Sequence, residues 1–254
     1  MIRRYSIAVA LFLSACPKGG GQVEALSLNL AAVDAAWEAG DYDSAREGLE
    51  QARQAYGEEP ELLWRLARLS SYQALYLPPT DALRLLGEAR AVGMACLEGD
   101  QVFAQRRAET GLSDAVEGLG PARGRCLVWT TWAWARWVVV FGRTGAAMDL
   151  QPVATLAAAV AEQPSPDMTR SWTLGLAAVA LGDLSRADEL LLQARAEEPM
   201  AWELVADQLT LVRAQQTEPA KSQELRDLLA AAQGLNPAEE RWVSAALRSE
   251  GTDD

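Results

Sequence analysis

The chain has 254 residues, 35 of them acidic and 23 basic, which gives a formal net charge of −12. Such an acidic chain is unsuited to nucleic acid, because phosphate groups are bound by lysine and arginine clustered on one face. The sequence contains no histidine, which excludes a Ser–His–Asp triad and a zinc site with histidine ligands. We therefore predict neither nucleic-acid binding nor histidine-based catalysis.

Residues 1–15 have the pattern of a secretory signal peptide. Arg3 and Arg4 form a basic start, and an apolar run from Ile7 to Leu13 follows. This run is too short for a transmembrane helix, which needs about 20 apolar residues. Removal of the segment takes away two positive charges and changes the formal net charge from −12 to −14.

The end of that segment, Leu13-Ser14-Ala15-Cys16, resembles the lipobox of bacterial lipoproteins. The resemblance implies cleavage before Cys16 and attachment of a diacyl group to its sulfur, so that residues 16–24 form a flexible tether to the membrane. Pro17 follows the cysteine in place of aspartate, which implies the periplasmic face of the outer membrane as the location. The alternative is an ordinary secretory signal with an incidental cysteine.

Residues 25–248 have the pattern of a helical domain. Alanine and leucine recur at three- and four-residue spacing, and alternating Val, Ile and Thr stretches are almost absent. Gly, Asn and Pro interrupt the pattern every 12 to 20 residues or so, the spacing of short helices joined by turns. We predict an all-α fold of roughly eleven or twelve helices in stacked hairpins, followed by an acidic disordered tail at 249–254.

Three segments share one spacing of small and large apolar residues, which indicates an internal repeat. The triplets are Ala45, Leu49 and Ala52; Ala82, Leu86 and Ala89; and Ala187, Leu191 and Ala194. Small residues allow two helices of a hairpin to approach closely, and glycine before the helix allows a tight turn. An ordinary amphipathic bundle is the alternative.

Residues 168–201 resemble a nearly full tetratricopeptide repeat, a unit of about 34 residues. The matching positions are Leu174, Gly175, Ala178, Gly182, Ala187, Leu191, Ala194 and Pro199. The two earlier units are degenerate, since Val33 and Arg68 stand where the first helix of the repeat has glycine. The resemblance implies a superhelix of stacked hairpins.

Cys96 and Cys126 are the cysteines that remain when Cys16 is acylated. Two cysteines are too few for a cysteine metal site. In an oxidising compartment they could form a disulfide, whereas as free thiols in apolar helices they would pack as small hydrophobic side chains. Neither a calcium-binding loop nor a glycine-rich phosphate loop is visible, so we predict no metal and no cofactor.

Residues 126–142 read CLVWTTWAWARWVVVFG and contain four of the nine tryptophans. At 3.6 residues per turn Trp129, Trp132, Arg136 and Trp137 share one broad face of a helix. Such a concentration of tryptophan predicts either a thick core or an aromatic-lined cavity.

Arg136 is a charged residue within this aromatic helix. Its guanidinium can extend to solvent, pair with a buried carboxylate or contact an anionic ligand, and we favour the ion pair. Trp64 and Tyr72 on an earlier helix are weaker candidates for the same cavity. The candidate ligand-binding residues are therefore Trp129, Trp132, Arg136, Trp137, Trp64 and Tyr72.

The lipobox, the degenerate repeats and the Trp-rich helix together resemble the T component of tripartite ATP-independent periplasmic (TRAP) transporters. The helix of that family has Trp, Asn, Gly and Trp at even spacing; Trp129 and Trp137 match the two tryptophans, while Ala133 and Ala135 replace Asn and Gly. The resemblance implies a small hydrophobic or organic-acid ligand, contact with a periplasmic solute-binding protein, and a homotrimer.

Two other functions are open at this point. A repeat lipoprotein could serve as a scaffold for outer-membrane or pilus assembly through another envelope protein, and an exposed aromatic groove would favour that function. A glycan-cleaving enzyme could use two carboxylates such as Glu109 and Glu117 on one helix. We predict a binding module, not an enzyme, with no catalytic residues.

Overall fold

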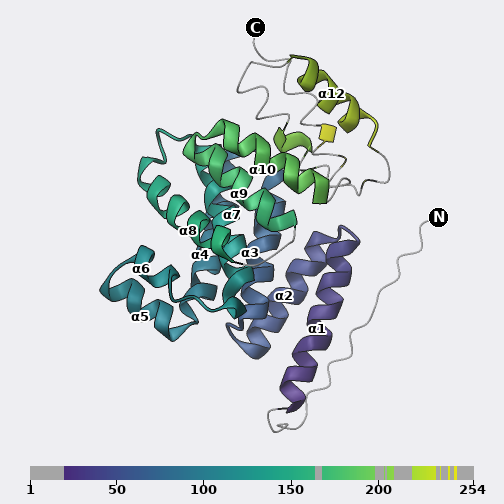
Figure 1. Cartoon of the computed structure of the whole chain (residues 1–254). Helices are drawn as coiled ribbons and strands as arrows, with labels where there is room; N and C mark the ends of the chain where they lie inside the picture. Colours follow the sequence, from purple (N-terminus) through teal and green to yellow (C-terminus); the bar gives the residue numbers. More distant parts are fainter. Residues whose placement is uncertain are drawn as a thin grey trace, which may run out of the picture.

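The computed structural model of the chain is all-α, as predicted (Figure 1). It describes residues 20–163, 168–197, 203, 205–208, 219–232, 235, 240 and 243–244. Within these ranges every regular element is a helix, and no helix is long and apolar enough to cross a bilayer. The predicted signal segment 1–15, the predicted lipidation residue Cys16, Pro199 of the predicted repeat and the predicted tail 249–254 lie outside the described residues.

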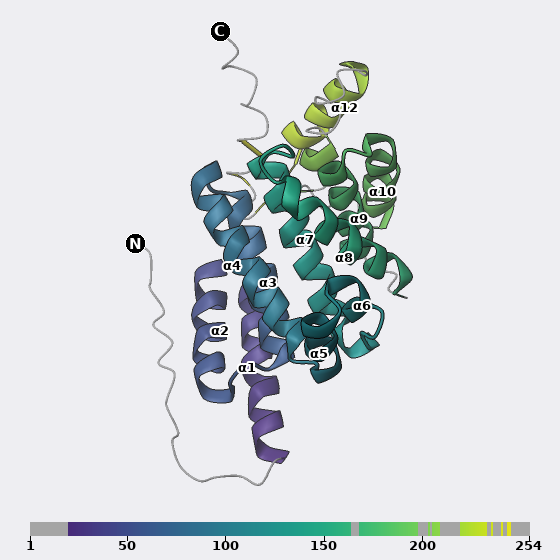
Figure 2. The same ribbon diagram turned by 90° about the vertical axis from the view of Figure 1, so that its left-hand side faces the viewer.

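The helices form stacked hairpins. In chain order they are α1 (Gly20–Glu38), α2 (Tyr42–Tyr56), α3 (Pro60–Leu75), α4 (Pro79–Glu98), α5 (Gln101–Glu109), α6 (Leu112–Val116), α7 (Gly124–Phe141), α8 (Leu150–Glu162), α9 (Met168–Leu181), α10 (Leu184–Glu197) and α12 (Pro219–Ala230), with short 3₁₀ turns at Pro121–Arg123 and Ala147–Asp149. Figure 2 shows the stack from α1 and α2 on one side, through α3, α4 and α7, to α8, α9 and α10 on the other.

The predicted repeat residues hold these hairpins together, and all nine members of the three Ala–Leu–Ala triplets are buried. In the segment that resembles the tetratricopeptide repeat, a Cβ atom at Gly175 would lie 2.9 Å from the Leu191 side chain, so glycine is needed where α9 meets α10. Gly182 has a φ of +85° and closes the turn between the same two helices. The spacing in the sequence therefore follows from the contacts within each hairpin.

Helix α1 starts earlier than the sequence indicated. Residues 20–24, which we expected to belong to the tether 16–24, form the first turns of α1. The helix is fixed further along by Leu30 and Val33, which are buried against α2 and α3. Because helix propagation costs far less than nucleation, the helix can extend back from its packed part to Gly20.

The Trp-rich helix α7 is central and packs against α3, α4, α8 and α9. It approaches α4 closely at Gly93, where a Cβ atom would lie 2.3 Å from the Thr130 hydroxyl oxygen. The Thr130 hydroxyl donates to the carbonyl of Cys126 at 2.6 Å, which satisfies it inside the interface. A disulfide joins Cys96 of α4 to Cys126 of α7, with the Cα atoms 5.7 Å apart.

Candidate functional site

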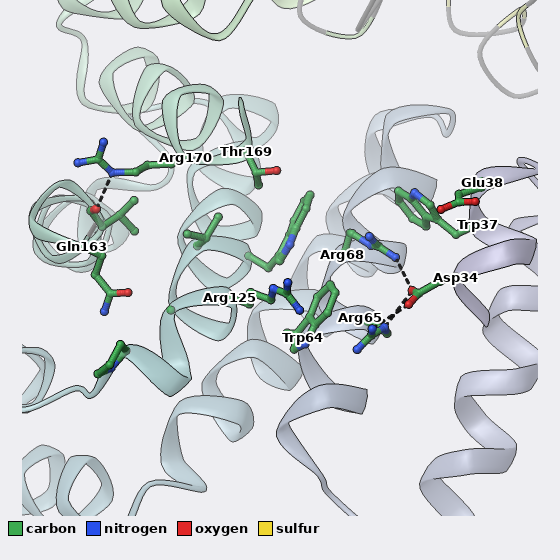
Figure 3. Close-up of a pocket in the computed structure, with 15 residues that line it drawn as sticks. Asp34, Trp37, Glu38, Trp64, Arg65, Arg68, Arg125, Gln163, Thr169 and Arg170 are labelled. Carbon is green, nitrogen blue, oxygen red and sulfur yellow. Dashed lines mark hydrogen bonds and ion pairs between the residues drawn. The ribbon is translucent and has the colours of Figure 1, made fainter. Parts of the chain in front are cut away.

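A cleft of about 570 Å³ lies between the hairpins, with walls from α1, α3, α7, the end of α8 and the start of α9 (Figure 3). Its aromatic lining is Trp37, Trp64 and Trp129. Its charged lining is Arg65, Arg68, Arg125, Arg170, Asp34 and Glu38. The cleft therefore brings four arginines together in a chain whose net charge is −12.

Three of the arginines surround one tryptophan ring, and we call Arg65, Arg68, Arg125 and Trp64 the cleft cluster. The guanidinium carbons of Arg65, Arg125 and Arg68 lie 4.2, 5.0 and 5.1 Å from the Trp64 ring centroid. Arg68 also lies 4.0 Å from the ring centroid of Trp37, between the two tryptophans. Cation–π attraction holds these guanidinium groups at the cleft wall despite their mutual repulsion.

Two carboxylates partly balance the cleft cluster. Arg65 donates from Nε to Oδ1 of Asp34 at 2.9 Å and from Nη2 to Oδ2 at 2.8 Å, a bidentate pair. Its Nη1 donates to Glu61 Oε2 at 2.7 Å, and that oxygen also accepts from Trp64 Nε1 at 2.9 Å. Arg125 is 3.9 Å from Glu61 and its side chain is 67% exposed. Three guanidinium groups thus share two carboxylates. The guanidinium of Arg125, which has the longest ion-pair distance of the three, faces the cleft.

The charged states of these groups reflect their surroundings. The hydrogen bond from Arg65 lowers the pKa of Asp34. Burial lowers the pKa of Arg68, against the attraction of Asp34. Within the described part of the chain, the buried Nε of Arg68 has no hydrogen-bond partner. The charged form of Asp34 is therefore favoured, and the buried Nε of Arg68 makes no hydrogen bond among the described residues.

An aromatic chain lies behind the cleft. The ring of Tyr72 lies 5.9 Å from Trp129, 6.4 Å from Trp132 and 5.8 Å from Trp172, measured between centroids. Trp132 is fully buried, and Trp129 is nearly so at the cleft floor. Of the candidate residues from the sequence, Trp64 and Trp129 line the cleft, while Tyr72 and Trp132 support it from behind.

Arg136 lies outside the cleft and makes an ion pair, the alternative that we favoured. Its Nη2 donates to Oδ2 and Oδ1 of Asp207 at 2.6 and 2.7 Å. The same carboxylate accepts from Nε1 of Trp172 at 2.7 Å. Only 12% of the Arg136 side chain and 7% of the Asp207 side chain are exposed, so the charge is neutralised in place.

Trp137, another candidate from the sequence, is not among the residues that line the cleft. Its ring stacks on Phe141 at 4.7 Å and lies 4.6 Å from the guanidinium of Arg90. Eight residues of α-helix turn a side chain about 80° away from its starting direction. Trp137 therefore points away from the cleft wall that Trp129 lines, toward α4.

The pair Glu109 and Glu117 does not lie on one helix. Glu109 is the last residue of α5, and Gly111, with a φ of +98°, interrupts the helical backbone before α6 begins. Glu117 follows α6, and both carboxylates are exposed. Nor do the described residues include a group of three His, Cys, Asp or Glu side chains that could hold a metal ion.

The sequence interpretation missed Trp37, Arg65, Arg68 and Arg125. A signal for two of them was present, because Arg65 and Arg68 interrupt an apolar helical stretch next to Trp64, as Arg136 does in α7. The same reasoning applies to both helices. Trp37 and Arg125 become visible only when α1 and α7 are placed around α3.

No protein-family model matches the chain. A search of curated proteins likewise finds no match.

Proposed function

We propose that this chain is a ligand-binding module whose cleft holds an organic acid with an apolar body. The observation that carries the proposal is the cleft cluster, in which three guanidinium groups surround Trp64 with two carboxylates between them. In a protein with net charge −12, such a gathering of arginine at a concave surface is the local reverse of the overall charge. An anionic ligand would reduce this local excess of positive charge.

The other lining residues fit the apolar part of such a ligand. Ligand sites in proteins are concave and mostly apolar, with a few polar groups that fix orientation, and occupy about 300–1,000 Å³. The volume of about 570 Å³ lies within that range, and Trp129 and Val128 supply a flat and an aliphatic wall. The guanidinium group of Arg125 at the wall supplies the polar contact, because arginine pairs with carboxylates through parallel hydrogen bonds.

We further propose that the module works at a membrane, as an accessory T component of a TRAP transporter that is anchored through Cys16 and contacts a solute-binding protein. The support is the resemblance of the lipobox, the repeats and the Trp-rich helix. The scaffold function for envelope assembly would be favoured by an exposed aromatic groove; Trp64, Trp129 and Trp132 are buried, and Phe141, which stacks on Trp137, is 47% exposed. Recovery of a solute-binding protein with the full chain from membranes supports the transporter role, and recovery of assembly factors contradicts it.

Titration of the intrinsic tryptophan emission with 3-phenylpropionate and its neutral amide tests the binding function. We expect a saturable change with the acid and a weaker affinity for the amide. Arg125→Gln should weaken binding of the acid about tenfold, the effect of one charge-assisted contact. The matched control is Arg84→Gln, since Arg84 is similarly exposed but pairs with Glu88 away from the cleft. Absence of any saturable response, or equal effects of the two substitutions, contradicts the proposal.

A further inference from the structure

We infer that Asp34 determines the specificity of the cleft by competing with the acid group of the ligand for Arg65 and Arg68. This inference rests on the proposed function. Asp34 comes from α1, whereas both arginines come from α3, so the acid reaches across the cleft wall to bind them (Figure 3). In this interpretation the cleft carries its own carboxylate, and the acid group of a ligand exchanges with it.

Arg65 binds Asp34 in the geometry in which arginine binds the carboxylate of a ligand. Arg65 holds both oxygens of Asp34 in a planar fork at 2.8 and 2.9 Å, and Arg68 approaches one of them at 3.4 Å. This is how arginine binds a free carboxylate. A ligand carboxylate that takes the place of Asp34 would find the same donors already in position.

The exchange is feasible because Asp34 can return to water. Its side chain is 36% exposed and lines the cleft, while the side chain of Arg65 is only 10% exposed. A carboxylate near solvent regains hydration when it is released, whereas a buried guanidinium needs a partner in place. Release of Asp34 without a replacement is therefore unfavourable, and release in exchange for another anion is nearly balanced.

The surrounding donors favour an anion that enters from the cleft. Arg68 reaches Asp34 only through Nη2 at 3.4 Å, and its side chain is 18% exposed. Arg125 stands 5.0 Å from the Trp64 ring with only a distant contact to Glu61. An anion inside the cleft can approach Arg125 and Arg68 as well as Arg65, whereas Asp34 is tied to α1. A neutral amide cannot replace the charge of Asp34, so the exchange selects for acids.

Isothermal titration of the full chain with 3-phenylpropionate and 3-phenylpropionamide tests the inference. Asp34→Asn keeps the shape and removes the competing charge, so affinity for the acid should rise about tenfold while affinity for the amide changes less than about twofold. Asp34→Glu keeps the charge and should retain the acid-to-amide ratio of the unmodified chain. Glu38→Gln is the matched control, because Glu38 lines the same cleft from α1 but makes no ion pair among the described residues.

The outcomes separate the two proposals. If the unmodified chain binds the acid but Asp34→Asn fails to tighten it, or Glu38→Gln tightens it equally, the exchange is wrong and the binding function stands. If the acid binds neither the unmodified chain nor Asp34→Asn, the binding function itself is wrong. A purely structural role of Asp34 predicts weaker binding of acid and amide alike in Asp34→Asn.

A second measurement uses the unmodified chain and so does not depend on the folding of a variant. The pKa of Asp34 is followed by carbon NMR of its carboxylate, with and without saturating 3-phenylpropane-1-sulfonate, which stays charged throughout the titration. Displacement from Arg65 should raise the pKa of Asp34 toward its ordinary value of 3.8. An unchanged pKa at saturation overturns the exchange.

Discussion

Two arginine–tryptophan clusters in this chain are built from the same kinds of side chain and differ in charge balance. In the cleft cluster, three guanidinium groups share Asp34 and Glu61, and Arg125 remains largely exposed. In the second, which we call the closed pair, Arg136 and Asp207 neutralise each other one to one beside Trp172. We interpret the closed pair as structural, and the cleft cluster is the site that we propose for binding.

Asp207→Ala tests the closed pair and should have the largest effect. It leaves the Arg136 charge buried without a partner, which should lower the free energy of unfolding by about 3–5 kcal/mol. Urea unfolding followed by circular dichroism measures it. Glu189→Ala is the control, since Glu189 pairs with Arg186 at an exposed position and should cost less than about 1 kcal/mol. A loss below about 1 kcal/mol in Asp207→Ala would show that the pair is not the structural element we describe.

Removal of the disulfide should destabilise the helix segment at the cleft cluster more than the segment at the closed pair. The Cys96–Cys126 bond closes a loop with a sequence separation of 30, for which chain entropy predicts a loss of about 3–4 kcal/mol in Cys96→Ala/Cys126→Ala. Arg125 adjoins the bond, whereas Arg136 lies about three turns further along α7. Hydrogen exchange should therefore increase more in residues 124–129 than in residues 134–139. Equal increases in both segments contradict this.

Matched lysine substitutions distinguish the roles of the two clusters in binding. Arg65→Lys keeps the charge but loses the planar fork, and should weaken binding of 3-phenylpropionate about fivefold. Arg136→Lys makes the same change at the closed pair and should leave the affinity within about twofold of the unmodified chain. Titration calorimetry gives both values. A larger loss of affinity in Arg136→Lys than in Arg65→Lys would indicate that the acid binds near the closed pair and not at the cleft cluster.

The pH dependence of stability should show the smallest effect. Because the hydrogen bond from Arg65 lowers the pKa of Asp34 below 3.8, its contribution is fully present above that value and is lost as the pH falls through the folded pKa. The stability difference between the unmodified chain and Asp34→Asn should be about 1 kcal/mol or less at pH 6, because Asp34 is partly exposed. Urea unfolding from pH 6 to pH 2.5 should show this difference shrinking below about pH 4. A difference that grows toward low pH would reverse the assigned sign.

Much of the fold followed from local pattern, because the Ala–Leu–Ala triplets and the turn glycines record contacts within a single hairpin. The Trp-rich helix was also found from sequence, and the ion pair of Arg136 was anticipated on energetic grounds. The cleft cluster was not, because its members come from α1, α3 and α7. Arg68 was noted only as a departure from the repeat glycine, and its position between Trp37 and Trp64 depends on how the hairpins stack.

The close approach of Gly93 to Thr130 has a mechanical consequence for the cleft. Helix α7 packs closely against α4 at Gly93 and Thr130 and is joined to it by the Cys96–Cys126 disulfide, so we expect the α7 wall of the cleft to be the stiffer one. The opposite wall, α1, packs chiefly on α2 and reaches α3 through Asp34, Trp37 and a few apolar side chains. We therefore expect the α1 side of the cleft to adjust more easily than the α7 side. Ligands of different width would be accommodated by a shift of the hairpin of α1 and α2.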